Sequence, residues 1–188
     1  MTKFFKFFVA CAVGLLTLFS CTKEEPATSS PDNLVVGSWC TTGIKLYFDG
    51  KTLLDQNVKE KDALYMSFYE DNTMHYSYGY PYKQIFTSYL REGDILYLFE
   101  RPLHIDELTD DRMVLTSLLE SVPVSSVPEE EWERKGTYMG HEVWTFPNWN
   151  NQLVYKKGDQ FIFFYDYYID NDNSLTADSL TYIFKRMD

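Results

Sequence analysis

The sequence predicts an all-β domain, an antiparallel meander that closes into a β-barrel and carries one short helical insertion. Three observations support this fold class. From Leu34 onward the apolar segments are short, they are rich in aromatic and β-branched residues, and turn residues separate them at hairpin spacing. Closure is expected because it removes the exposed edges that an open meander leaves.

The predicted strands of this meander run from residue 34 to residue 185. Three regular hairpins join 64–69 to 74–80, 85–90 to 95–99 and 103–108 to 113–118. The stretch 161–169 is almost wholly apolar or aromatic, which is typical of a strand covered on both faces. The other predicted strands are 34–41, 44–48, 143–146, 152–156, 160–169 and 180–185.

The segment 120–140 departs from the strand pattern. Ser126 and Glu129 have the spacing of a capping box, further acidic residues follow, and Gly136 stands where a helix would stop. We therefore expect a short helix over 127–135, with Trp132 packing it onto the barrel.

The first twenty residues have the pattern of a secretory signal peptide. Lys3 and Lys6 precede an uncharged apolar run over 7–19. As a helix this run would reach ~20 Å, which is short against a hydrocarbon core of ~30 Å. We therefore expect residues 1–20 to be removed on export.

The run ends at Leu18-Phe19-Ser20-Cys21, which resembles the lipobox of bacterial lipoproteins. The resemblance implies that Cys21 becomes the acylated N-terminus and attaches the protein to a membrane. Residues 21–33 are rich in Thr, Ser, Pro and Glu, so we expect a flexible tether that leaves 34–188 as the folded domain. Lys23, Glu24 and Glu25 are similar to the tract that directs some Gram-negative lipoproteins outward. This likeness implies an outer-membrane anchor with the domain facing the cell exterior.

Composition narrows the partners of the folded domain. The formal charge of the whole chain is −11, and loss of the two signal-peptide lysines makes the remainder more acidic. An acidic domain is a poor partner for nucleic acid or for anionic lipid headgroups. After processing, Cys40 is the only cysteine besides Cys21, so no intramolecular disulfide is expected, and Cys40 is expected to be a buried, inert thiol.

The folded part resembles the lipocalin-like domains of bacterial lipoproteins. Gly37 and Trp39 match the family's opening G-x-W, in which the tryptophan plugs one end of the barrel. The stretches 66–73, 89–98, 105–115 and 182–186 resemble successive family motifs in the family's order. The resemblance implies about eight strands with one open mouth, and it implies no particular ligand.

Catalytic and metal-binding motifs are not evident in the sequence. His75, His104 and His141 are spread along the chain, so no metal site, no cofactor and no enzymatic activity are expected. Asp106 and Glu107 are strand neighbours and would point to opposite faces. Residues 170–178 partly match a calcium loop but lack its glycine and its final glutamate.

Aromatic residues are the most informative feature of the domain. Tyr76, Tyr78, Tyr80 and Tyr82 fall at period two and share a face wherever the strand continues. They belong either to the core and outer wall or to a tyrosine-lined pocket suited to sugars, small apolar molecules or a peptide strand. The sequence thus favours a binding module for a small apolar or glycan ligand. The alternative is a structural or protein-interaction accessory subunit of an envelope complex, without a small ligand.

Overall fold

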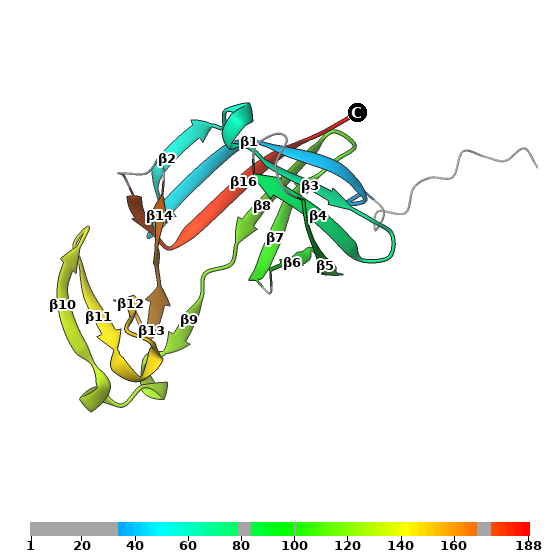
Figure 1. Ribbon diagram of the computed structural model, residues 1–188. Helices are drawn as coiled ribbons and strands as arrows, with labels where there is room; N and C mark the ends of the chain where they lie inside the picture. The colour runs from blue at the N-terminus through cyan, green and yellow to red at the C-terminus, as the bar shows by residue number, and fades with distance from the viewer. Residues whose placement is uncertain (1–33, 79–83, 100, 169–173) are drawn as a thin grey trace, which may run out of the picture.

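The computed structural model describes residues 34–78, 84–99, 101–168 and 174–188 (Figure 1). Eight antiparallel strands form a closed barrel, because β16 pairs with β8 on one side and with β1 on the other. The predicted all-β fold class and barrel closure are confirmed. The barrel strands are β1 (Gly37–Phe48), β3 (Leu64–Phe68), β4 (Thr73–Tyr78), β5 (Ile85–Glu92), β6 (Ile95–Leu98), β7 (Arg101–Leu108), β8 (Arg112–Ser117) and β16 (Ser179–Arg186).

The three predicted hairpins are the β3–β4, β5–β6 and β7–β8 pairs of the barrel. Their turns use residues that tolerate positive φ, with Asn72 at 62° and Gly93 at 61°. In the first hairpin the Asp71 carboxylate accepts bonds from the Thr73 amide and hydroxyl, at 3.0 and 2.6 Å. Local turn chemistry therefore fixes the register of these strand pairs.

The first strand is longer than predicted, because 37–48 forms one strand with a bulge between Thr41 and Gly43. The Thr41 hydroxyl accepts a bond from the Leu64 amide and donates to the Leu64 carbonyl, at 2.6 and 2.9 Å. A further strand, β2 (Lys51–Asn57), pairs with the second half of β1 and lies outside the ring. Beyond the bulge, β1 and β2 thus extend the wall past the barrel mouth.

Residues 121–163 leave the barrel and form a second, five-stranded sheet. The prediction that these strands continue the barrel meander is wrong, because only β16 returns to the ring. The sheet order is β10-β11-β12-β13-β9, and Figure 1 shows it as a separate lobe beside the barrel. Its strands are β9 (Ser121–Pro123), β10 (Glu133–Tyr138), β11 (His141–Phe146), β12 (Gln152–Lys157) and β13 (Gln160–Phe163).

The long apolar stretch 160–169 is divided between two sheets. Strand β13 ends at Phe163, and after Phe164 the chain begins β14 (Tyr165–Tyr168), which pairs only with β15 (Ser174–Ala177). The single strand predicted here is wrong, since the two halves bury their side chains in different clusters. Phe161 packs inside the second sheet, whereas Tyr167 packs against the β1 extension.

The helix predicted over 127–135 is also wrong. Its place holds one 3₁₀ turn, η4 (Glu129–Glu131), followed directly by β10. The Ser126 hydroxyl donates back to the Pro123 carbonyl at 2.7 Å, and Trp132 packs against Trp144 and Phe161 of the second sheet rather than the barrel. Pairing with β11 outweighs the local helix signals. The remaining helical turns are η2 (Glu60–Asp62), η3 (Val124–Ser126) and η5 (Pro147–Trp149).

One end of the barrel is closed by Trp39, which is fully buried. Its indole nitrogen donates to the Val35 carbonyl at 2.8 Å. The Arg186 guanidinium lies 4.4 Å from the centre of the indole ring and donates to the Val36 and Leu34 carbonyls, at 2.9 and 2.6 Å. Gly37 has a φ of +133°, and a Cβ added there would lie 2.3 Å from the arginine. The glycine thus permits the close approach of Arg186 to the backbone.

The second sheet is attached to the barrel at the turn that follows β1. The Phe48 ring lies 4.8 Å from that of Tyr155 in an aromatic cluster shared by both lobes. The Asp178 carboxylate accepts bonds from the Asp49 amide and the Tyr155 hydroxyl, both at 2.7 Å. Asp49 in turn forms an ion pair with Lys157 at 2.6 Å. These buried and half-buried contacts fix the lobes together.

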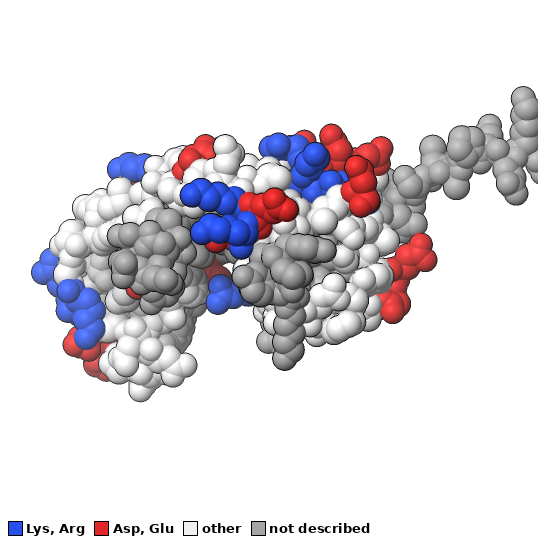
Figure 2. All heavy atoms as spheres, turned by 45° about the horizontal axis from the view of Figure 1, so that its top comes forward, with Lys and Arg blue, Asp and Glu red and all other residues white. Residues whose placement is uncertain are grey.

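The surface carries both signs of charge. On the face shown in Figure 2, acidic and basic side chains lie singly or in small mixed groups, and the surface is hollowed between the two lobes. Within the part of the chain that the structure describes, no helix is long and apolar enough to cross a membrane. Cys40 is half-buried, and burial raises the pKa of its thiol, which disfavours the reactive thiolate.

Candidate functional site

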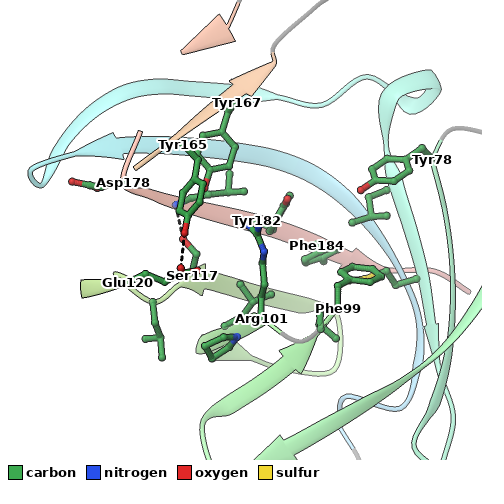
Figure 3. A pocket seen from close by; sticks show the side chains of 17 residues that line it. Tyr78, Phe99, Arg101, Ser117, Glu120, Tyr165, Tyr167, Asp178, Tyr182 and Phe184 are labelled. Atoms are coloured by element: carbon green, nitrogen blue, oxygen red, sulfur yellow. Dashed lines mark hydrogen bonds between the residues drawn. The ribbon is translucent and has the colours of Figure 1, made fainter. Parts of the chain in front are cut away.

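The barrel mouth opposite Trp39 contains a cavity of about 250 Å³ (Figure 3). Barrel strands supply an apolar floor that includes Leu64, Met66 and Phe184, and polar groups come both from barrel strands and from the segments beyond the barrel. The other lining residues are Tyr78, Leu98, Phe99, Arg101, Pro102, Leu103, Ser117, Leu118, Glu120, Tyr165, Tyr167, Asp178, Leu180 and Tyr182.

Strand alternation places the barrel residues of this site. Arg101 lies two residues before Leu103 on β7, and Tyr182 lies two residues before Phe184 on β16. Because Leu103 and Phe184 are buried in the barrel core, Arg101 and Tyr182 share the inner face with them. The cavity is therefore the open end of the same interior that Trp39 closes.

The β14–β15 hairpin supplies two tyrosines from outside the ring. Tyr165 and Tyr167 are alternate residues of β14, and in Figure 3 both extend toward the cavity. The Tyr165 hydroxyl donates to the Glu120 carboxylate at 2.5 Å. Burial together with this carboxylate raises the pKa of Tyr165, so its hydroxyl stays protonated and continues to donate.

Arg101 is the single cation among the lining residues that the structure describes. Its guanidinium carbon lies 5.4 Å from the centre of the Tyr165 ring. Its charge favours the ionised forms of Tyr165, Tyr167 and Tyr182, which places it near all three hydroxyls. Arg101 thus lies where the cavity's polar groups converge, and Figure 3 shows its side chain rising into this space.

Three tyrosine hydroxyls in the cavity have no hydrogen-bond partner among the described residues: those of Tyr78, Tyr167 and Tyr182. Burial raises the pKa of Tyr182 to about 12 and also raises the pKa of Tyr78 and Tyr167. All three are therefore neutral at physiological pH. Each can donate one hydrogen bond to a bound molecule.

A second, more open cavity of about 780 Å³ adjoins the first. The two share Leu64, Leu180 and the same three tyrosines as lining. Its outer rim is polar and comes from the end of β2 and from η2. The rim residues are Gln56, Asn57, Lys59, Lys61 and Asp62. The site thus passes from an apolar interior to a polar rim.

The sequence-predicted tyrosine ladder is only partly at this site. Tyr78 lines both cavities, whereas Tyr76 packs against the barrel core with its ring 4.6 Å from that of Phe99. Phe99 has a φ of 54°, a strained value for a bulky residue, which orients its ring at the cavity edge. Tyr80 and Tyr82 lie outside the described residues, as do Cys21, Lys23, Glu24 and Glu25.

The histidines and paired acids considered in the sequence lie elsewhere. His75 contacts Tyr69 and Phe86, His141 contacts Asp49, and His104 is bonded to Asp106 at 2.8 Å. Among the described residues no group of side chains is arranged to hold a metal ion. Glu107 pairs with Arg112, so it and Asp106 have separate partners. Of the calcium-like segment, 170–173 lies outside the described residues, and Asp178 is bonded to Tyr155.

Sequence reasoning missed most of this site. For Arg101 and Tyr182 a usable signal existed, because each lies two residues from an apolar core position on its strand. For Glu120, Tyr165 and Tyr167 there was none, because they reach the mouth through the excursion of the chain into the second sheet. Comparison of the chain with protein-family models, curated proteins and solved structures finds no match.

Proposed function

We propose that this chain is a lipid-anchored lipoprotein of the cell envelope whose barrel binds a small apolar or glycan ligand without catalysing a reaction. The cavity at the barrel mouth carries this proposal. Its apolar floor is ringed by tyrosines, three of whose hydroxyls have no partner among the described residues, and this is the usual composition of a small-molecule site. Tyrosine rings bind either apolar groups or the apolar faces of sugars, while their hydroxyls fix orientation.

The size of the site agrees with a small ligand. The inner cavity of about 250 Å³ is slightly below the range of about 300–1,000 Å³ common for such pockets. The adjoining cavity provides space for the part of a ligand that extends outward. A ligand of modest size can therefore contact the apolar floor and the polar rim together.

Binding without catalysis is supported by the bonds that the polar lining groups already make. The Asp178 carboxylate is held by Tyr155 and Asp49, and the Ser117 hydroxyl accepts a bond from the Leu180 amide at 2.8 Å. These groups are committed to the fold rather than poised as nucleophile or base.

The proposed location depends on the N-terminal segment. The lipobox-like Cys21 would attach the protein to the outer membrane, and Lys23, Glu24 and Glu25 would direct it to the exterior. The acidic net charge of the chain supports a domain that binds neither nucleic acid nor anionic lipid. Metabolic labelling with a palmitate analogue tests the anchor: the wild type should be labelled and Cys21→Ala should not.

A ligand screen tests the binding function. The purified full-length protein is titrated with glycans and with small apolar compounds, and heat release is recorded. Leu118→Trp should abolish binding, because Leu118 lines the cavity and the larger ring would fill it. Leu119→Trp is the matched control, since Leu119 is an exposed neighbour outside the lining. The absence of measurable binding for both glycans and apolar compounds would overturn the proposal.

The alternative role in protein interaction also has an observation in its favour. Phe86 on β5 is 70% exposed, and Ile85 and Leu90 are also exposed on the same strand. An exposed apolar strand is a feature of protein contact surfaces. If this role is correct, a partner will co-purify stoichiometrically from membranes with the wild type but not with Phe86→Ser. Leu119→Ser serves as a control at another exposed apolar position.

A further inference from the structure

The Arg101 side chain extends into the cavity above its apolar floor. Apart from the Tyr165 ring, no residue that the structure describes forms a hydrogen bond or an ion pair with its guanidinium. Arg101 is exposed at the barrel mouth, so its N–H donors are accessible to a bound molecule. A ligand that supplies an acceptor would meet this guanidinium beside the apolar floor of the cavity.

The neighbouring polar groups add donors rather than acceptors. The hydroxyls of Tyr167 and Tyr182 have no hydrogen-bond partner among the described residues; they are protonated at neutral pH, and each offers one O–H. The lining also holds two carboxylates, but that of Glu120 already accepts the Tyr165 hydroxyl, and that of Asp178 accepts the Tyr155 hydroxyl and the Asp49 amide. The cavity therefore has an excess of donors around one positive charge.

We propose that this cavity selects a ligand that carries a carboxylate, received by the Arg101 guanidinium and the tyrosine hydroxyls around it. This inference rests on the binding function proposed above and names the ligand's chemistry. The planar guanidinium fork matches a carboxylate, with which it forms two parallel charge-assisted bonds. Because the carboxylates of Glu120 and Asp178 also line the cavity, a ligand with one negative charge is favoured over a phosphate dianion.

The body of the ligand is indicated by the floor of the cavity. Leu64, Met66, Leu103 and Phe184 offer only apolar contacts. They favour a short fatty acid, whereas a sugar acid would leave several hydroxyls without partners there. Both are carboxylates, and the experiment separates them.

The test measures binding to the full-length protein in lipid nanodiscs, with empty nanodiscs correcting for partition into lipid. Octanoate is compared with octan-1-ol, and glucuronate with glucose. Octanoate should bind roughly tenfold or more tightly than octan-1-ol, because only the carboxylate forms charge-assisted bonds. Arg101→Met should weaken octanoate binding roughly 10- to 100-fold and leave octan-1-ol unchanged. Arg134→Met is the matched control, since Arg134 lies on β10 of the second sheet.

A second pair of variants tests the hydroxyls. Tyr182→Phe keeps the ring and removes one donor, so octanoate affinity should fall several-fold. Tyr97→Phe is the control, because its hydroxyl donates to Glu92 outside the cavity. Both should retain the wild-type denaturation midpoint.

The outcomes separate this inference from the function beneath it. Arg101-dependent binding of glucuronate alone supports carboxylate recognition and assigns the source to sugar acids. Equal affinity for octanoate and octan-1-ol, unchanged in Arg101→Met, overturns carboxylate selection and leaves the binding function intact. No binding of any of the four probes to the wild type overturns both.

Discussion

At each end of the barrel an arginine lies against an aromatic ring, and the two arginines differ in what their guanidinium groups bind. Arg186 covers Trp39 and donates to the carbonyls of Val36 and Leu34. Arg101 lies beside Tyr165 and binds no acceptor among the described residues. The same pairing of an arginine with an aromatic ring thus closes the barrel at one end and leaves a guanidinium without a described acceptor at the other.

The largest expected effect on stability comes from truncating Trp39, the side chain that closes one end of the barrel. Trp39→Ala should lower the free energy of unfolding by about 3–5 kcal/mol, because the indole is fully buried and its loss leaves a cavity beneath Arg186. Chemical denaturation of wild type and variant measures the difference. A midpoint equal to that of the wild type would show that Trp39 does not seal the barrel.

Arg186→Met tests the arginine of the closed end directly. It should lower the free energy of unfolding by about 2–4 kcal/mol, since two carbonyls lose a charged donor and the indole loses the cation beside it. Arg186→Lys should recover only part of the lost free energy of unfolding, because an ammonium group cannot reproduce the planar guanidinium that bonds both carbonyls. Full recovery by lysine would indicate that charge alone matters here.

Gly37→Ala examines the space that the closed end requires. The free energy of unfolding should fall by about 1–3 kcal/mol, because the added Cβ meets Arg186 and the φ of +133° is strained for alanine. Gly136→Ala is the matched control, since its φ of +143° imposes similar strain but nothing lies near its Cβ position. If both variants lose the same stability, the effect is backbone strain and not displacement of the arginine.

Alkaline pH should lower the stability of the protein through Tyr182 at the open end of the barrel. The pKa of Tyr182 is about 12 in the folded protein, above the value of ~10 for a free tyrosine. The unfolded chain therefore loses this proton first. Stability should fall as pH rises above 10 and continue to fall until the folded group ionises near 12. Denaturation at several pH values should show a shallower decline for Tyr182→Phe, and identical curves would contradict the prediction.

The smallest effect on stability is expected at Arg101. Arg101→Met should change the free energy of unfolding by no more than about 0.5 kcal/mol, because no described carbonyl or carboxylate loses a partner. Its denaturation curve should overlay that of the wild type in the absence of ligand. A loss as large as that of Arg186→Met would show that the two arginines have equivalent structural roles.

The sequence predicted the barrel best where structure is set locally. The β3–β4, β5–β6 and β7–β8 hairpins each combine alternating apolar residues with a turn at Asn72, Gly93 or 109–112. These signals lie within twenty residues, so they can be recognised without knowledge of the rest of the fold. Barrel closure followed from the need to pair the remaining edges.

Prediction failed where distant pairing decides the structure. Strand β2 is mostly exposed and polar, so no alternation marks it, and its pairing with β1 alone defines it. The residues at Ser126 and Glu129 favour a helix locally, but the hydrogen bonding of β10 with β11 outweighs this preference. The break at Phe164 was hidden because aromatic residues continue on both sides of it.

The candidate site was harder to predict than the barrel. Tyr78 was recognised from its spacing, but Arg101 was overlooked because a charged residue at a strand end normally faces solvent. Tyr165 and Glu120 meet across 45 residues of chain, through a sheet that the sequence did not separate from the barrel. A site assembled from such segments becomes visible only when the path of the chain is known.

The pairing of β16 with β1 has a consequence for how the protein folds. Arg186 bonds to Val36 across 150 residues, so the ring cannot close until nearly the whole described chain has been assembled around it. Contacts of such sequence separation slow folding because the entropy of loop closure is paid before the contacts form. The hairpins from β3 to β8 can form early, while the two edges that β16 joins stay open. Refolding should therefore show a slow final phase in which Trp39 becomes buried, and that phase is the interval during which the unclosed sheet is exposed to aggregation.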